Sequence, residues 1–535
     1  MDYTNGAPHI GHAYEKVLAD VLARYHRLKG DEVFFLTGVD QHGQKVQQSA
    51  EKQGVAPQKF VDGITAKFVA LWEKLNVRYD GWAATTAPSH KDCVRAILQR
   101  LWDDQGADGQ SQWIYRKSEG GYYSVRQEQF LTDKERGADG EFGPEWQPVE
   151  FREEENFYFR LLEHKQWLLD LIDARSQAGK PLVVPEFRVG ELRNAVEKLE
   201  GDLCISRPAA RLKWGIPFPE SFGAGFVTYV WFDALVNYIS FAPSYDPAPA
   251  RPPEAFLRLW RSIVHVIGKD IMIPAHGVYW PIMLKALGFA DEEIPALLVH
   301  GWWNIKTKSG ESEKMSKTLG NVVDPDVLAD KYGAEAVRYY LMSDISTGKD
   351  SDFSEERLVQ RFNTDLANSL GNLLNRTLNM VAKYREGILK RRDAETQRPD
   401  FVQTGTDGYV ASIDAAASEP LLHSAIDHAI HIAVGCNQLI DAEKPWALAK
   451  DVAQAERLDA VLYTLAESLR IVAILLSPIL PKAAQGIFDQ LNWKTDLSGQ
   501  EERFRLADAV WGGLPDGHQL GKPTPLFPRI EAPAA

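Results

Sequence analysis

The sequence has 535 residues, a formal net charge of −14 and three cysteines. A chain of this length exceeds what one hydrophobic core organises, so several domains are expected. Charged residues make up 25% and hydrophobic residues 44%, as in ordinary globular proteins, and the apolar runs are too short to span a bilayer. The acidic balance excludes a protein that coats nucleic acid by bulk charge, but it is compatible with a local basic groove.

The cysteines, Cys93, Cys204 and Cys436, are widely separated and form no Cys-x-x-Cys pair. This spacing supports neither a disulfide framework nor a cysteine zinc site. The sequence begins without a basic segment followed by an apolar stretch, the pattern of a secretion leader. We therefore expect a cytoplasmic protein with no zinc and no membrane segment.

The first informative motif ends in His9-Ile10-Gly11-His12 and directly follows Pro8. A turn that opens a helix between two strands offers unpaired backbone N–H groups to an anion. Gly11 permits close approach of a ligand, and both histidines can donate hydrogen bonds to phosphate. For this short motif alone, two ordinary surface histidines near a helix cap are the favoured interpretation.

Apolar residues at helical spacing continue to Gly30, and residues 33–36 are predicted to form a buried strand. Only Met1 to Thr4 are available for a strand before the motif, so we expect a first strand that is truncated, or a start that lies upstream. Asp40 follows the next strand, at the sheet edge where open α/β proteins bind ligands. It can pair with an amino group, or it can cap a helix.

A small insertion is predicted where the composition changes, from about Gly106 to Gly143. Later, Trp231, Ala234 and Tyr238 share one face of a predicted helix and leave a slot for an apolar side chain. From spacing alone, core packing is the favoured interpretation of that face. A strand then ends at Gly268, where a glycine admits a sugar and Asp270 can bridge two ribose hydroxyls.

The sequence Lys-Met-Ser-Lys-Thr at residues 314–318 is the second motif, and from residue 354 the pattern is helical almost to the end. Lys314 and Lys317 suit the β- and γ-phosphates of a nucleotide. In the helical part, Asn372 and Arg376 stand four residues apart and can reach one ligand. Together with Trp446, these residues suit either a well-packed bundle or the recognition of unpaired bases.

The two motifs, in this order, resemble the His-Ile-Gly-His and Lys-Met-Ser-Lys-Ser signatures of class I aminoacyl-tRNA synthetases. The helix with Trp231, Ala234 and Tyr238, followed by Gly-Lys-Asp at residues 268–270, resembles methionyl-tRNA synthetases in particular. The resemblance covers nearly the whole chain, to about Leu491. In the second signature Thr318 stands where the family has serine, which keeps the hydroxyl.

The resemblance implies a Rossmann-like α/β catalytic domain with a parallel sheet and a small inserted domain, followed by an all-α helical-bundle anticodon-binding domain. The expected units of the catalytic part are a first half with a truncated first strand (1–105), an insertion without a zinc knuckle (106–200) and a second half (201–310). A region with the second signature and the tRNA stem contact (311–355) and the anticodon-binding bundle (356–535) follow.

The resemblance also implies an ATP-dependent ligase that forms methionyl-adenylate and then methionyl-tRNA, with tRNA(Met), L-methionine, and ATP with Mg²⁺ as substrates, and that acts as a monomer. The expected catalytic residues are His9, His12, Lys314 and Lys317. The expected ATP-binding residues are Pro8, Gly11, Gly268, Asp270, His300 and Lys317. The expected methionine-binding residues are Tyr3, Asp40, Trp231, Ala234, Tyr238, Ile271 and His276. The expected anticodon-binding residues are Asn372, Arg376 and Trp446.

His276 lies one residue later than the family's usual spacing after Gly-Lys-Asp, with Pro274 nearby. Two other classes of protein stay open at this point. One is a nucleotidyltransferase with the same first signature that adenylylates a small acid without tRNA. The other is a catalytically inactive RNA-binding paralogue, which the short first strand favours.

Overall fold

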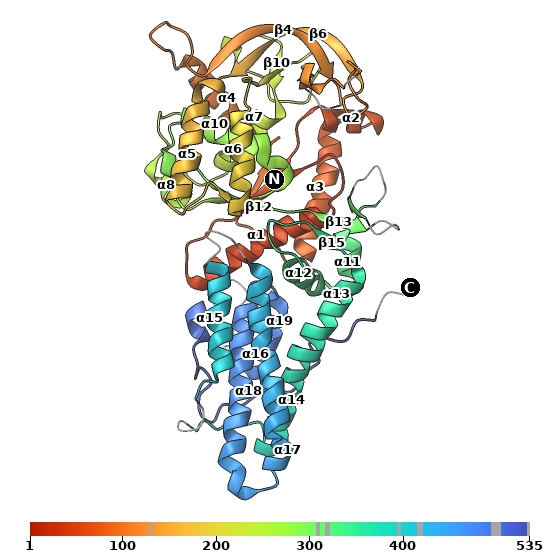
Figure 1. The fold of residues 1–535 in the computed structure, drawn as a ribbon, viewed down its shortest axis with the longest axis vertical. Coiled ribbons are helices and arrows are strands. Elements are labelled where there is room, and N and C mark those ends of the chain that lie inside the picture. The colour runs from red at the N-terminus through yellow and green to blue at the C-terminus, as the bar shows by residue number, and fades with distance from the viewer. Residues whose placement is uncertain are drawn as a thin grey trace.

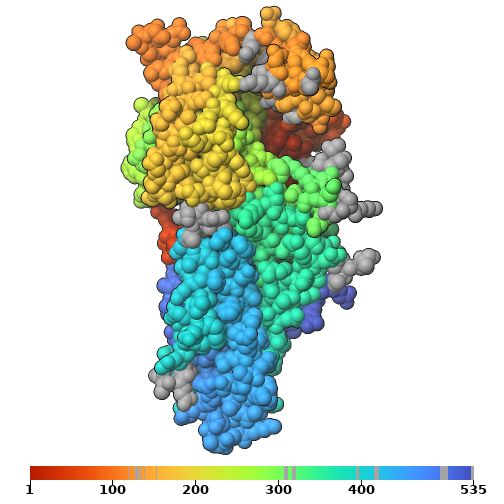
Figure 2. All heavy atoms as spheres, in the orientation of Figure 1, coloured from red at the N-terminus to blue at the C-terminus, as the bar shows by residue number. Residues whose placement is uncertain are grey.

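The structure is a computed structural model of an elongated molecule, with mixed α/β layers at one end and a helical bundle at the other (Figure 1), and Figure 2 shows the same elongated outline with all heavy atoms drawn. It describes residues 1–126, 129–131, 133–137, 139–306, 311–315, 321–392, 397–414, 421–493 and 504–531. The predicted fold class, a Rossmann-like α/β domain followed by an all-α bundle, is confirmed. No helix in these ranges is long and apolar enough to cross a bilayer.

A three-stranded parallel sheet with the order β1-β2-β3 holds the first motif. Its strands and helices are β1 (Asp2–Tyr3), α1 (Ile10–Lys29), β2 (Leu36–Asp40), α2 (Gln44–Lys52), α3 (Pro57–Lys74), β3 (Gly81–Ala84) and α4 (Pro88–Asp103). The predicted strand at 33–36 is wrong by about three residues, because β2 is aligned by its two partners. Leu36 is opposite Gly81 in β3, and Asp40 is opposite Tyr3 in β1.

The α1 helix shows how local sequence sets an element. His9 is its N-cap, and Gly30 ends it in the left-handed region at φ 100°, where glycine carries no steric penalty. The apolar side of α1 is fully buried, with Ile10, Val17 and Val21 at 0% exposure. The start of α1, and with it the first motif, is therefore fixed against the core.

A four-stranded antiparallel sheet with the order β5-β4-β6-β8 forms the insertion at the far end of the α/β part (Figure 1). Its strands are β4 (Ile114–Ser124), β5 (Gln129–Leu131), β6 (Val149–Phe159) and β8 (Leu203–Cys204). A two-stranded antiparallel sheet follows, from β9 (Ser206–Pro208) and β10 (Phe226–Thr228).

The second parallel sheet has the order β11-β12-β7. Its strands and surrounding helices are α5 (Lys165–Gln177), β7 (Val183–Val184), α6 (Val189–Glu197), α7 (Val230–Ser240), α8 (Glu254–Trp260), β11 (Val264–Gly268), α9 (Lys269–Ile271), α10 (Trp280–Ala286) and β12 (Ala296–His300). β7 lies within the range 106–200 that is predicted as the insertion, yet it pairs with β12. We propose that the chain first returns to the catalytic part with α5 and β7 and then rejoins the insertion sheet at β8, so the two units are interleaved in the sequence.

A third small sheet, with the order β14-β13-β15, contains Lys314, the first residue of the second motif, and leads to the bundle. The elements of this connecting region are β13 (Trp303–Lys306), β14 (Ser312–Lys314), α11 (Pro325–Tyr332), α12 (Ala334–Ser343) and β15 (Ser351–Phe353). The bundle helices are α13 (Glu355–Arg361), α14 (Asn372–Arg385), α15 (Asp400–Asp414), α16 (Leu422–Glu443), α17 (Pro445–Leu448), α18 (Ala455–Leu476) and α19 (Pro481–Leu491). A π-helical segment, Phe362–Gly371, joins α13 to α14.

One hydrophobic core runs from α1 and α3 through α12 into the bundle, while a second core lies between the insertion, α7 and the second parallel sheet. Arg338 of α12 ties the two ends of the first core together. Its buried guanidinium lies 2.7 Å from the Asp20 carboxylate of α1. It also donates to the carbonyl oxygens of Leu75, Pro478 and Ile479, at 3.1, 2.9 and 2.8 Å.

Candidate active site

The first motif forms a helix cap built from two histidines. His9 Nδ1 accepts a hydrogen bond from the Gly11 N–H at 3.1 Å, and His12 Nδ1 accepts one from the His9 N–H at 3.1 Å. The centroids of the two imidazole rings are 3.8 Å apart. Since each Nδ1 is an acceptor, the proton of each neutral ring lies on Nε2, which makes Nε2 a donor. The two histidines therefore do cap the helix. The caps also orient both Nε2–H donors, so capping does not exclude a role in binding phosphate.

The structure connects the first signature to the chain that follows the second signature, of which Lys314 and Met315 are described. The Ile10 N–H donates to the Val323 carbonyl at 3.1 Å, which joins the start of α1 to the chain just after the second motif. Lys314 Nζ lies 3.5 Å from the centroid of the Trp302 ring. The Trp302 indole N–H in turn donates to Asp270 at 3.2 Å. Lys317 lies outside the described residues.

The end of β11 and the end of β12 form a cradle without side-chain bulk. Gly268 is opposite His300 in the parallel register. A Cβ atom on Gly268 would lie 2.7 Å from an Asp270 carboxylate oxygen and 3.5 Å from the His300 ring. Only glycine leaves this space open for a ligand. The sequence analysis predicts all three of these residues, and the structure brings them together.

Glu15, which the sequence analysis does not name, faces the same cradle. Its carboxylate lies 3.3 Å from His300 Nε2 and 2.7 Å from Lys16 Nζ. Burial by itself would raise the pKa of Glu15, but the Lys16 ammonium and His300 hold that pKa well below its usual range. The available signal was its place on α1, three residues after His12, on the same helix face.

A second cluster of the predicted methionine-binding residues, which we call the α7 pocket, lies on α7 and on the segment after β11. The Tyr238 hydroxyl donates to His276 Nε2 at 2.7 Å, and His276 Nδ1 donates to the Ile271 carbonyl at 2.9 Å. The Trp231 ring meets the His276 ring edge-on, at 6.2 Å between centroids. Ala234 lies on the same helix and is buried. The predicted pocket residues thus surround one site.

The late position of His276 has a structural explanation. The segment from Met272 to Tyr279 is not one continuous helix, because Ile273 departs from helical angles at φ −115° and ψ 131°. This break lies between Asp270 and His276, where the extra residue stands, and the His276 ring still reaches Tyr238. Burial lowers the pKa of His276 to about 4, which keeps the ring neutral and able to accept from Tyr238.

Asp40 ends β2 beside this pocket and does not cap a helix. The N-cap of α2 is Gly43, so the capping alternative for Asp40 is wrong. Asp40 is buried, and its Oδ1 has no hydrogen-bond partner in the described structure. Burial, followed by the nearby Asp233 carboxylate, raises the pKa of Asp40 well above its usual value. A buried carboxylate oxygen without a partner suits a cationic ligand group.

Tyr3 and the Asp40 loop are held over the pocket from two sides. Tyr3 is opposite Asp40 in the β1–β2 register, and its hydroxyl is 2.9 Å from the point where a Cβ on Gly43 would lie. The Trp214 indole N–H donates to the Gln41 carbonyl at 2.6 Å. The loop after β2 is therefore fixed by contacts from residues far away in the sequence.

A buried hydrogen-bond network that the sequence analysis misses joins this loop to α7. Asp233 accepts from His42 Nδ1 at 2.6 Å and from His90 Nε2 at 2.7 Å, and His90 Nδ1 lies 2.7 Å from the Ser240 hydroxyl. Burial would raise the pKa of Asp233, but His42 and then His90 lower it to about 2. The available signal was the position of Asp233, between Trp231 and Ala234.

The three predicted anticodon residues lie in the bundle, far from the catalytic cradle (Figure 1). Asn372 and Arg376 are on α14, and Arg376 pairs with Asp441 of α16 at 3.1 Å. Trp446, on α17, is 43% exposed. Asn372 is also exposed. Asn372 and Trp446 are therefore accessible to a partner.

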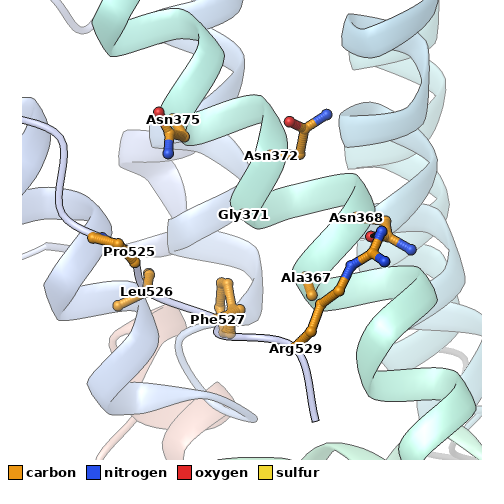
Figure 3. Close-up of a pocket in the computed structure, with 9 residues that line it drawn as sticks. All are labelled: Ala367, Asn368, Gly371, Asn372, Asn375, Pro525, Leu526, Phe527 and Arg529. Carbon is orange, nitrogen blue, oxygen red and sulfur yellow. Dashed lines mark hydrogen bonds between the residues drawn. The ribbon is translucent and has the colours of Figure 1, made fainter. Parts of the chain in front are cut away.

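Asn372 lines a pocket of about 530 Å³ between α14 and the C-terminal segment (Figure 3). Figure 3 shows asparagine amides on the helix side and apolar side chains on the side of the C-terminal segment. Arg529 closes one end of the pocket and donates to Asn368 at 2.7 Å. The full set of lining residues is Ala367, Asn368, Gly371, Asn372, Asn375, Pro525, Leu526, Phe527 and Arg529.

Two parallel sheets, a histidine-capped phosphate turn next to a lysine-bearing loop, and an appended helical bundle define a class I aminoacyl-tRNA synthetase. The sequence matches the family profile described as "tRNA synthetases class I (M)" over residues 1–140 and 145–378. The methionine–tRNA ligase of Deinococcus radiodurans is 38% identical over 541 residues, covering 100% of this chain and 74% of that protein. That of Thermosynechococcus vestitus is 38% identical over 540 residues, covering 99% and 97%.

The solved structure of Mycobacterium tuberculosis methionyl-tRNA synthetase in complex with methionyl-adenylate has a TM-score of 0.85, 34% identity, and coverage of 99% of this chain and 98% of that chain. This likeness extends over both the α/β part and the bundle. The chain belongs to the methionyl-tRNA synthetase family.

Proposed function

We propose that this protein is a methionine–tRNA ligase. It activates methionine with ATP to give methionyl-adenylate and pyrophosphate, and it then transfers the methionyl group to the 3′ end of tRNA(Met). The observation that carries the proposal is the hydrogen bond from the Ile10 N–H of the first signature to the carbonyl of Val323, which follows the second signature by five residues. A triphosphate held there has its α-phosphate next to the pocket for the amino acid.

The α7 pocket binds methionine in this proposal. The thioether chain lies against Trp231, Ala234 and Tyr238, because sulfur makes favourable contacts with aromatic edges. Neutral His276 forms the base of the pocket, together with Ile271. Asp40 accepts the substrate ammonium through its unpartnered oxygen, and Tyr3 covers the site.

ATP binds between α1 and the β11–β12 edge in this proposal. The Nε2 donors of His9 and His12 face phosphate oxygens, with Pro8 and Gly11 shaping the turn. Asp270 accepts from the ribose hydroxyls, and Gly268 and His300 border the nucleoside. The magnesium ion enters as part of the ATP complex, bound to phosphate oxygens.

The chemistry needs no covalent enzyme intermediate. The methionine carboxylate attacks the α-phosphorus in line, the α–β phosphoanhydride bond breaks, and pyrophosphate leaves. The enzyme positions the reactants and stabilises the negative charge on the phosphate oxygens. Lys314 and Lys317 stabilise the leaving pyrophosphate. The terminal adenosine hydroxyl of tRNA then attacks the acyl carbon and displaces AMP.

The bundle recognises the anticodon in this proposal. Asn372 and Arg376 make amide and guanidinium contacts to unpaired bases, and Trp446 stacks on one of them. The exposed amides that line the pocket in Figure 3 extend this face toward Arg529. The net charge of −14 is compatible with this role because base stacking and amide contacts need no basic surface.

We propose that the protein acts as a cytoplasmic monomer without zinc. All three cysteines are unpaired. In the insertion, Arg136 stacks on Tyr122 and Phe142, at 4.8 and 4.3 Å to the ring centroids. Ser124 donates to the Trp146 carbonyl at 2.6 Å. These contacts supply the cross-links that zinc provides in other small loop-rich units.

The deciding experiment is methionine-dependent exchange between ATP and labelled pyrophosphate, followed by charging of purified tRNA(Met). Both activities are expected. Exchange without charging or tRNA binding would favour a nucleotidyltransferase that acts on a small acid alone. Binding of tRNA without exchange would favour an inactive RNA-binding paralogue. Unchanged activity after dialysis against a zinc chelator, with Mg²⁺ restored, would support the absence of zinc.

A further inference from the structure

The Trp302 side chain contacts three charged groups of the active site at once. Its ring centroid is 3.5 Å from Lys314 Nζ and 3.9 Å from Lys269 Nζ. Its indole N–H donates to Asp270 Oδ1 at 3.2 Å. Ammonium groups at these distances are within the range in which the electron-rich face of an indole attracts a cation.

The two lysines differ in what else they contact. Lys269 forms an ion pair with Asp350 at 2.6 Å, so its charge is balanced without the indole. For Lys314, the described residues supply no carboxylate within ion-pair range, and the indole face is the contact that the structure gives its ammonium group. The aromatic ring therefore matters more for Lys314 than for Lys269.

The ring also stands on a fixed backbone. The backbone N–H of Trp302 donates to Asp350 Oδ1 at 2.9 Å. At the preceding residue, a Cβ on Gly301 would lie 2.0 Å from the Lys349 carbonyl, so the backbones of Gly301 and Lys349 are in close contact. Trp302 thus stands on a backbone that is held in place, and Lys314 is the last residue of β14.

We propose that Trp302 is a positioning residue that holds Lys314 beside the nucleotide site before ATP arrives, and that it releases the ammonium group to the β- and γ-phosphates. This inference rests on the proposed function. A phosphate oxygen forms a stronger, charge-assisted hydrogen bond with an ammonium group than an indole face does, so the transfer is favourable. Part of the entropy cost of ordering Lys314 is then paid before the nucleotide binds.

The test compares Trp302→Phe, which keeps an aromatic face but loses the N–H donor to Asp270, with Trp302→Leu, which loses both. Trp302→Leu is expected to raise the KM for ATP in pyrophosphate exchange about tenfold, which corresponds to about 1.4 kcal/mol, while the KM for methionine changes less than about twofold. Trp302→Phe is expected to stay within about threefold of the wild type.

The chain offers a matched control in Trp167. Its ring centroid is 4.4 Å from Lys285 Nζ, and its indole N–H donates to Asp291 at 3.0 Å, so it repeats the same pair of contacts away from the active site. Trp167→Leu is expected to leave the KM for ATP unchanged. A large effect there would mean that loss of any such tryptophan perturbs the enzyme.

A second readout does not depend on activity. Trypsin cleaves after lysine, so without ATP the Lys314–Met315 bond is expected to be cut several-fold faster in Trp302→Leu than in the wild type or in Trp302→Phe, as mass spectrometry of the fragments would show. Equal KM effects of Phe and Leu would assign the role to the Asp270 hydrogen bond and overturn the proposal. Unchanged KM and cleavage in Trp302→Leu would overturn it as well. A wild type without exchange activity would instead refute the proposed function, and the cleavage comparison would still test this inference.

Discussion

Replacing Asp233 by asparagine tests whether the buried network sets the geometry of the methionine pocket. The substitution keeps the shape of the side chain but removes the charge that accepts from His42 and His90, at 2.6 and 2.7 Å. Asp233 is fully buried, and its pKa falls from 3.8 to about 2, a shift that corresponds to roughly 2 kcal/mol. Leaving a buried donor without its acceptor costs about 1–3 kcal/mol, and two histidine donors lose the same charged acceptor here.

We therefore expect Asp233→Asn to lower the free energy of unfolding by about 3 kcal/mol. The melting temperature is then expected to fall by about 6–12 °C, at about 2–4 °C per kcal/mol. The KM for methionine in pyrophosphate exchange is expected to rise about tenfold or more, because the Asp40 loop and α7 lose their connection. The KM for ATP is expected to change little, since the network does not contact the β11–β12 edge.

Ser240→Ala is the matched control, because Ser240 is at the outer end of the same network, 2.7 Å from His90. Loss of this neutral hydrogen bond is expected to cost only about 1 kcal/mol. A KM for methionine within about twofold of the wild type in Asp233→Asn would refute the positioning role. An unchanged melting temperature would refute the energetic reasoning independently.

Three further predictions concern other parts of the site. Lys317→Ala is expected to slow methionine activation about 100-fold or more, because one charged contact to the pyrophosphate is lost; near-normal exchange would remove this residue from the mechanism. Trp446→Ala is expected to weaken tRNA charging while exchange stays intact, and equal loss of both activities would contradict the anticodon role. His276 has its pKa lowered from 6.5 to about 4, so the unfolded chain binds the proton more readily, and stability is expected to fall as the pH drops from about 6.5 to about 4. The melting temperature should therefore depend less on pH in that range for His276→Gln than for the wild type. An equal pH dependence of the two proteins would contradict the assignment of this pKa shift.

Local sequence predicted those parts of the fold that local interactions determine. The α1 helix follows from its apolar spacing, the cap at His9 and the positive φ of Gly30. The strand before Asp40 was misplaced because its limits depend on β1 and β3, which are remote in sequence. Pairing across the sheet, rather than the hydrophobicity of the strand itself, determines where it begins.

The candidate site shows the same division. The motifs located Asp40, Tyr238 and His276, since each stands in a recognisable stretch. Asp233 is separated from His42 by 191 positions in the sequence and from His90 by 143 positions, so no periodicity reveals these contacts. The break in the helix at Ile273 was also hidden, because an extra residue changes the spacing without showing where the backbone absorbs it.

The buried guanidinium of Arg338 restricts how this enzyme can be recombined with its relatives. Two of its acceptors, the Pro478 and Ile479 carbonyls, belong to the turn between α18 and α19, and its carboxylate partner belongs to α1. A bundle transplanted from another synthetase must therefore present two main-chain oxygens at the same place, or the graft leaves a buried cation partly unsatisfied. Exchanging whole bundles between synthetases is thus constrained by a buried contact between the bundle and the α/β part.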